Sequence, residues 1–149
     1  MSYVPPTHEA LRIAYLQTVL TVDGRPASDV VAEMGSFWVL TAYNPLSEQL
    51  TPVENVERQQ KLVTRLGEMS YHWLPALGAS PEGTWDEESL AVFGAGKRPI
   101  RALGREFNQH GVFEVTKQAL KVHGCFSRWS MQRPLRRREG LLWEKASNC

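Results

Sequence analysis

The sequence predicts a mixed α+β fold, with a single sheet of about five strands and helices packed against it. Short runs of β-branched and aromatic residues alternate with segments of helical periodicity along the 149 residues. The composition, with 42% hydrophobic and 22% charged residues, is typical of a globular protein. Because the chain has the length of one ordinary domain, we expect residues 1–149 to form a single domain.

The first part of the chain predicts two short helices and two strands. In order, these are a helix at residues 8–17, a strand at 19–22, a helix at 28–34 and a strand at 37–42. Thr7 is suited to cap the first helix, and Asp23-Gly24 is a strong turn pair after the first strand. Apolar residues are consecutive in 37–42, which is typical of a strand covered on both faces. We therefore expect this strand to be central in the sheet.

A longer helix is predicted to begin at Pro52. Thr51, Pro52 and Glu54 combine an N-cap, a proline at the first helical position and a capping-box carboxylate. Gly67 is placed where a left-handed cap would end the helix. The apolar residues expected to be buried are Val53, Val56, Leu62, Val63 and Leu66.

The second half predicts four more strands, two of them paired in a hairpin, and a helix. The expected order is a strand at residues 71–77, a loop at 78–84, a strand at 88–93, a helix at 99–108 and a hairpin of 112–115 with 119–122. Pro75 cannot donate a hydrogen bond, so it favours an edge position for its strand. A terminal helix is expected over 135–146.

Residues 125–149 form a basic C-terminal extension, which we expect to belong to the same domain. Residues 121–149 carry a net charge of about +5, whereas the rest carries about −4. A basic tail can contact nucleic acid, lie against the acidic body or be solvated. Since the body is acidic, we expect little affinity for nucleic acid. The arginines at 136–138 should pair with acidic residues of the body or of a second copy, so a homo-oligomer stays open.

Several classes of protein find no support in the sequence. No apolar run approaches the roughly 20 residues of a membrane span, and the first residues lack the order of a secretory signal. Cys125 and Cys149 make no disulfide framework, so we expect a cytoplasmic protein. Neither a metal-ligand spacing nor a phosphate or dinucleotide fingerprint is present, so no metal and no cofactor is expected.

Three polar clusters fall at the ends of predicted strands and helices. They are Tyr43-Asn44-Pro45-Leu46-Ser47, Trp85-Asp86-Glu87-Glu88-Ser89 and Asn108-Gln109-His110. Because binding sites form where strand ends and helix termini converge, we expect these clusters to share one site.

The same residues carry a resemblance to a known family. The segment TAYNPLS, then Glu54-Asn55, then Trp85-x-x-Glu88-Ser89 and Phe107-x-Gln109-x-x-Val112-Phe113, resembles the bacterial family known as domain of unknown function 3293. The likeness covers roughly residues 8–130, and it rests on the order and spacing of the motifs. Glu88-Ser89 stands where family members more often have Glu-Pro-Ser. The resemblance implies where the site lies and leaves the function unknown.

We expect a site that binds a small polar, nucleotide-like molecule. The predicted ligand-binding residues are Tyr43, Asn44, Ser47, Asn55, Ser89 and Gln109, whose side chains suit planar hydrogen-bonding groups. The alternative is a hydrolase or transferase in which Glu88 and His110 act as acid and base, so enzyme activity stays open. Asp86 and Glu87 are predicted to be loop charges. Simple structural roles remain alternatives, with Asn44 in an ordinary turn and His110 as a helix cap.

Overall fold

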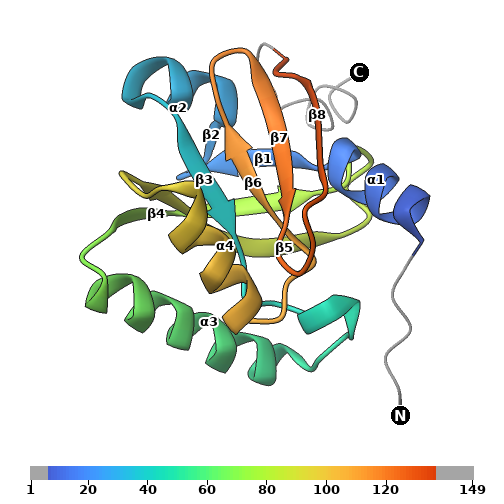
Figure 1. Ribbon diagram of the computed structural model, residues 1–149, viewed down its shortest axis with the longest axis vertical. Helices are drawn as coiled ribbons and strands as arrows, with labels where there is room; N and C mark the ends of the chain where they lie inside the picture. Colours follow the sequence, from blue (N-terminus) through green and yellow to red (C-terminus); the bar gives the residue numbers. More distant parts are fainter. Residues whose placement is uncertain (1–6, 137–149) are drawn as a thin grey trace.

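The protein folds as one curled, antiparallel sheet with helices on both faces (Figure 1). The computed structural model describes residues 7–136, and these residues form eight strands in the order β2-β1-β4-β5-β3-β6-β7-β8. The predicted α+β class is confirmed, but the expected number of about five strands is wrong. The strand predicted to be central, β3, does lie inside the sheet between β5 and β6.

The elements follow one another along the chain with short connections. The strands are β1 (Val19–Val22), β2 (Arg25–Pro26), β3 (Phe37–Leu40), β4 (His72–Ala79), β5 (Asp86–Phe93), β6 (Gly111–Val115), β7 (Ala119–Gly124) and β8 (Ser130–Pro134). The helices are α1 (His8–Gln17), α2 (Ala27–Met34), α3 (Pro52–Glu68) and α4 (Lys97–Glu106), with a 3-10 turn η1 (Pro45–Ser47).

Two strands were missed because their sequences carry weak strand signals. The strand β2 has only two residues, and it completes the hairpin that the Asp23-Gly24 turn begins. The strand β8 is polar, and its exposed residues alternate with half-buried ones along the edge of the sheet. The predicted loop at 78–84 is shorter than expected, since β4 continues to Ala79.

Pro75 lies in an interior strand, contrary to the expected edge position. Its carbonyl accepts a hydrogen bond from the backbone N–H of Asp23 (2.7 Å), at the turn where the neighbouring β1 has just ended. Backbone N–H and C=O groups of one strand residue face the same neighbour. The missing donor of Pro75 therefore faces a turn, and the ladder with β5 stays intact.

Each face of the sheet has its own apolar core. We call the face that packs against α3 and α4 the α3 face, and the face that packs against α2 the α2 face. The core on the α3 face includes Trp38, Leu40, Leu62, Leu66, Leu90, Val92, Ile100 and Leu103. The core on the α2 face includes Leu20, Val22, Val30, Val31, Phe37, Val39, Ala91 and Leu120.

The capping box of α3 forms as predicted, but its buried stripe differs. The Thr51 hydroxyl accepts from the backbone N–H of Glu54, and the Glu54 carboxylate accepts from that of Thr51. Val53 and Val56 are 68% and 45% exposed, whereas Asn55 is buried. The helix also continues past Gly67 to Glu68.

Arg133 and Trp129 of the basic extension pack against α1. The Arg133 guanidinium donates to the backbone carbonyls of Leu16 (2.6 Å) and Thr18 (3.0 Å) at the end of α1. The Trp129 ring lies 6.1 Å from that of Tyr15. Residues 137–149, with Arg137, Arg138 and most of the predicted terminal helix, lie outside the described residues. Between residues 7 and 136, no helix has the length and apolar character needed to cross a bilayer.

Candidate functional site

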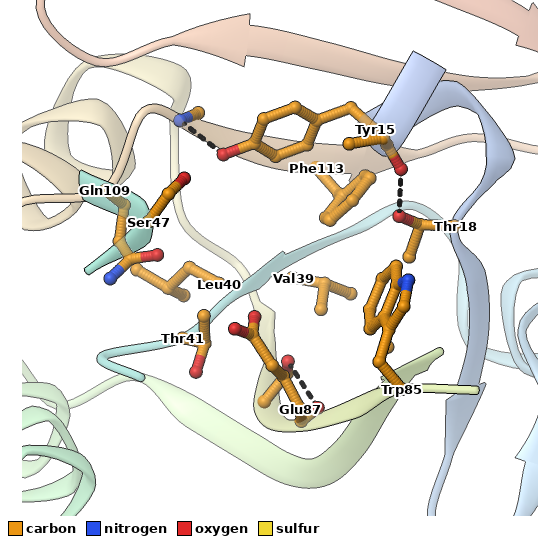
Figure 2. Close-up of a pocket in the computed structure, with 14 residues that line it drawn as sticks. Tyr15, Thr18, Val39, Leu40, Thr41, Ser47, Trp85, Glu87, Gln109 and Phe113 are labelled. Carbon is orange, nitrogen blue, oxygen red and sulfur yellow. Dashed lines mark hydrogen bonds between the residues drawn. The ribbon is translucent and has the colours of Figure 1, made fainter. Parts of the chain in front are cut away.

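A cavity of about 230 Å³ lies between α1 and the α2 face of the sheet (Figure 2). The side chains around it come from α1, from the ends of β3 and β6, and from β4 and β5. It is lined by Ala14, Tyr15, Thr18, Val39, Leu40, Thr41, Ser47, Gly78, Trp85, Glu87, Ser89, Gln109, Gly111 and Phe113. Figure 2 shows the Glu87 carboxylate directed into this space from below, with Trp85, Phe113 and Tyr15 around it.

Small residues on β4 and α1 leave room for the cavity. Gly78 lies directly opposite Glu87 in the β4–β5 ladder, so no side chain fills the space beside the carboxylate. Ala14 and Thr18 are the α1 residues on the same side. The helix is held above the sheet by the Tyr15 hydroxyl, which accepts from the backbone N–H of Gly111 (3.0 Å).

Glu87 is the carboxylate of the cavity, and Glu88 is not. Successive strand residues point to opposite faces, so Glu87 shares the α2 face with Ser89, while Glu88 is exposed on the α3 face. The expectation that Glu87 is a loop charge is wrong, because β5 begins at Asp86 and Glu87 is half-buried. Burial raises the pKa of Glu87, and a hydrogen bond from Asn44 opposes that rise.

Asn44 positions Glu87 from a strained turn. Its Nδ2 donates to Glu87 Oε1 (3.0 Å), and its Oδ1 accepts from Asn55 Nδ2 and from the backbone of Leu50, both at 3.0 Å. The backbone of Asn44 is left-handed (φ 46°), not extended as its position before Pro45 would favour. Leu46 and Ser47 also have positive φ values of 49° and 66°. Such strain persists where the surrounding structure fixes it, and it often marks functional sites.

The amide and guanidinium groups of α3 hold the backbone beneath this turn. Gln59 accepts from the backbone N–H of Ala42 (2.8 Å) and donates to the carbonyl of Glu88 (3.1 Å). Arg58 donates to the carbonyls of Ala42 and Phe107, and so links the residues that directly precede the first and third polar clusters. Sequence reasoning missed both residues. The signal was the spacing 55, 59, 62 and 66, which places two amides on the same helical stripe as two leucines.

The third cluster is joined to the first through the backbone. Gln109 Nε2 donates to the carbonyls of Tyr43 (3.0 Å) and Phe107 (3.2 Å), and the N–H of Leu46 donates to the carbonyl of Asn108 (2.6 Å). His110 does not line the cavity. Burial lowers the pKa of His110, and a backbone hydrogen bond with Leu46 opposes that change.

The three predicted clusters therefore lie side by side, but their residues differ in position. Ser47, Ser89 and Gln109 line the cavity, whereas Asn44 and Asn55 support it from behind. Tyr43 does not line it, and its hydroxyl lies 3.4 Å from Glu88 Oε2. Burial raises the pKa of Tyr43 most, and the charge of Glu88 adds to that.

Most of the aromatic lining came from outside the predicted site. Trp85 belongs to the second predicted cluster, although it was not among the predicted ligand-binding residues. Sequence reasoning placed neither Tyr15 nor Phe113 in a cluster, since their positions depend on how α1 and β6 pack over β5. Among residues 7–136, no three His, Cys, Asp or Glu side chains come together as a metal site would require.

Comparison with protein families agrees with the motif spacing. Residues 40–112 match the family described as "Protein of unknown function (DUF3293)". The chain carries a DUF3293 domain. The resemblance inferred from the motifs is thereby confirmed over this range. The chain matches no curated protein and no solved structure.

The DUF3293 domain contributes only part of the cavity wall. The matched residues supply Glu87, its support Asn44, and the opposing Gly78. The helix α1 and Phe113 lie outside the matched range, and they close the cavity from above.

Proposed function

We propose that this protein binds a small molecule in the cavity between α1 and the sheet. The observation that carries the proposal is the Glu87 carboxylate, which is half-buried and directed into a hollow to which the part of the chain that the structure describes contributes no cationic side chain. Burying a carboxylate costs free energy unless it is paired or used. The chain also places Asn44 in a strained turn to hold this carboxylate, which a purely structural role does not require.

The size and charge of the cavity limit the kinds of ligand that it could hold. Its volume of about 230 Å³ lies below the range of roughly 300–1,000 Å³ that is usual for drug-sized ligands. No Lys, Arg or His between residues 7 and 136 lines it, so a phosphate group would meet Glu87 without a compensating charge from these residues. These properties favour a molecule the size of a single ring or an amino acid, and they disfavour a whole nucleotide.

A second candidate function is acid–base catalysis by Glu87. A carboxylic acid whose pKa is raised by burial keeps its proton to a higher pH than an exposed one, which suits it to act as a general acid. The pairing of Glu88 with His110 has less support, since Glu88 is exposed on the α3 face and His110 lies outside the lining. Binding is the simpler proposal because it requires only the arrangement of groups around the cavity.

The proposal can be tested by blocking the cavity without unfolding the protein. A Cβ at Gly78 would make only ordinary contacts, the nearest at 3.4 Å from Thr18, so Gly78→Val should fold and extend its methyl groups beside Glu87. The protein would be equilibrated with a mixture of small metabolites, and retained compounds would be identified by native mass spectrometry. We expect the wild type and Glu88→Gln to retain the same compound and Gly78→Val to retain none. Equal retention by all three proteins would contradict a ligand site in this cavity.

A further inference from the structure

We propose that the ligand of this cavity is a small organic cation with planar N–H donors, such as an amidinium, a guanidinium or a protonated amine on a ring. This inference rests on the proposed function and specifies the chemistry of that same site. It follows from three properties of the lining: its charge, the direction of its hydrogen bonds and its aromatic rings.

Among the described residues of the lining, Glu87 is the only one with a charged side chain, and one of its oxygen atoms remains available. Oε1 accepts from Asn44, whereas no donor from the described residues lies within hydrogen-bond distance of Oε2. A partly buried carboxylate with one open oxygen is stabilised by a cation that also donates a hydrogen bond. An anionic ligand would add a second negative charge in the same poorly solvated space.

Three of the five hydroxyl groups that line the cavity already donate their proton within the protein. Thr18 donates to the carbonyl of Ala14 (2.7 Å), Thr41 to that of Glu88 (2.7 Å) and Ser89 to that of Glu87 (3.2 Å). A hydroxyl group has one proton, so these three groups retain only lone pairs for a ligand. The cavity therefore suits a molecule that donates hydrogen bonds.

The amide of Gln109 follows the same pattern. Its Nε2 group donates to the carbonyls of Tyr43 and Phe107, which uses both of its protons. Only its Oε1 atom is left for a ligand, so this side chain also acts as an acceptor toward the cavity. A ligand that mainly accepts hydrogen bonds, such as a carboxylate, would find no free donor on Thr18, Thr41, Ser89 or Gln109.

The aromatic rings complete a site for a planar cation. Trp85, Phe113 and Tyr15 surround the space in front of Glu87, and Trp85 is 43% exposed at its rim (Figure 2). The ring faces attract cations and stack on planar groups. A cation held by Glu87 on one side and by an aromatic face on another matches both features.

Three probes that share one ring and differ in charge would test this inference. They are benzamidine, which is cationic, benzamide, which is neutral, and benzoate, which is anionic. Binding would be measured by isothermal titration calorimetry to the full chain, to Glu87→Gln and to the adjacent Glu88→Gln. The two variants remove the same charge from neighbouring residues on opposite faces, so Glu88→Gln is a matched control.

We expect the wild type to bind benzamidine more tightly than benzamide and not to bind benzoate. Glu87→Gln should weaken benzamidine roughly ten- to a hundredfold, the usual size of a hydrogen bond to a charged group, and leave benzamide nearly unchanged. Glu88→Gln should leave all three affinities unchanged. Benzamidine affinity should also rise with pH as Glu87 ionises.

Other results would overturn the ligand class. Equal or tighter binding of benzoate would show that the cavity does not select cations, and so would an equal loss of benzamidine affinity in both variants. Failure of the wild type to bind benzamidine would also reject the class, even if Gly78→Val abolishes retention of some other compound. In that last case the proposed function would stand and only the ligand chemistry would be wrong.

Discussion

The two halves of the α2 face are built from the same strands but packed in opposite ways. Where α2 covers the sheet, Val30, Val31 and Phe37 are almost completely buried and fill the space between helix and strands. Where α1 covers it, Ala14, Thr18 and Gly78 are among the residues that line a cavity. The difference lies in side-chain size, since both helices are short. Small residues leave room for the cavity in the half under α1. The closely packed half under α2 is expected to contribute more to the stability of the fold.

The largest expected change in stability compares a phenylalanine of the filled half, Phe37, with one beside the cavity, Phe113. Phe37 is 1% exposed, and its ring lies 5.2 Å from that of Phe93. Phe37→Ala should lower the free energy of unfolding by about 3–5 kcal/mol, because it removes apolar contacts and leaves a new cavity. Phe113→Ala should cost clearly less, since Phe113 is half-buried beside a cavity that already exists. Urea denaturation of both variants gives the comparison, and equal losses would mean that the two halves are packed alike.

A smaller effect is expected where α3 supports the turn beneath the cavity. Gln59→Ala removes the acceptor of the buried N–H of Ala42, which should cost about 1–3 kcal/mol. Gln60→Ala is the matched control, because Gln60 is exposed on the next position of the same helix. The difference between the two free energies of unfolding isolates the contribution of the buried amide. If both variants were equally stable, the contacts of Gln59 would not hold the turn.

Local signals predicted the helices well, and they predicted the sheet less completely. The Thr51 capping box fixes where α3 begins because all of its partners lie within four residues. The two missed strands depend on neighbours instead: β2 follows from a turn, and β8 pairs with β7 along a polar edge. Strand pairing of this kind is set by distant residues and leaves little pattern in the strand itself.

The sequence placed the three polar clusters near the candidate cavity more successfully than it selected the residues that line this cavity. Polar clusters at the ends of elements placed 43–47, 85–89 and 108–110 together, as the contacts between Asn44 and Glu87 and between Gln109 and Tyr43 illustrate. The choice between Glu87 and Glu88 depended on which residues of β5 point to each face of the sheet. A shift of one residue in a strand exchanges its two faces. The sequence placed the start of this strand two residues late, so the alternation through Glu87, Ser89 and Ala91 was not used.

The smallest expected effect concerns the cost of keeping Glu87 in the hollow half. Because burial raises the pKa of Glu87, the folded protein holds this proton more tightly than the unfolded chain. The contribution of Glu87 to stability is therefore greatest below its unfolded pKa near 4.5, and it is lost as pH rises through the folded pKa.

Glu87→Gln should raise the melting temperature of the ligand-free protein at pH 7 by no more than a few degrees, and this gain should shrink toward pH 4. Differential scanning fluorimetry across this range, with Glu88→Gln in parallel, measures the effect. A gain of equal size in Glu88→Gln would assign it to the loss of any negative charge from β5, whereas a gain confined to Glu87→Gln would show that the hollow half gives up stability to hold a carboxylate.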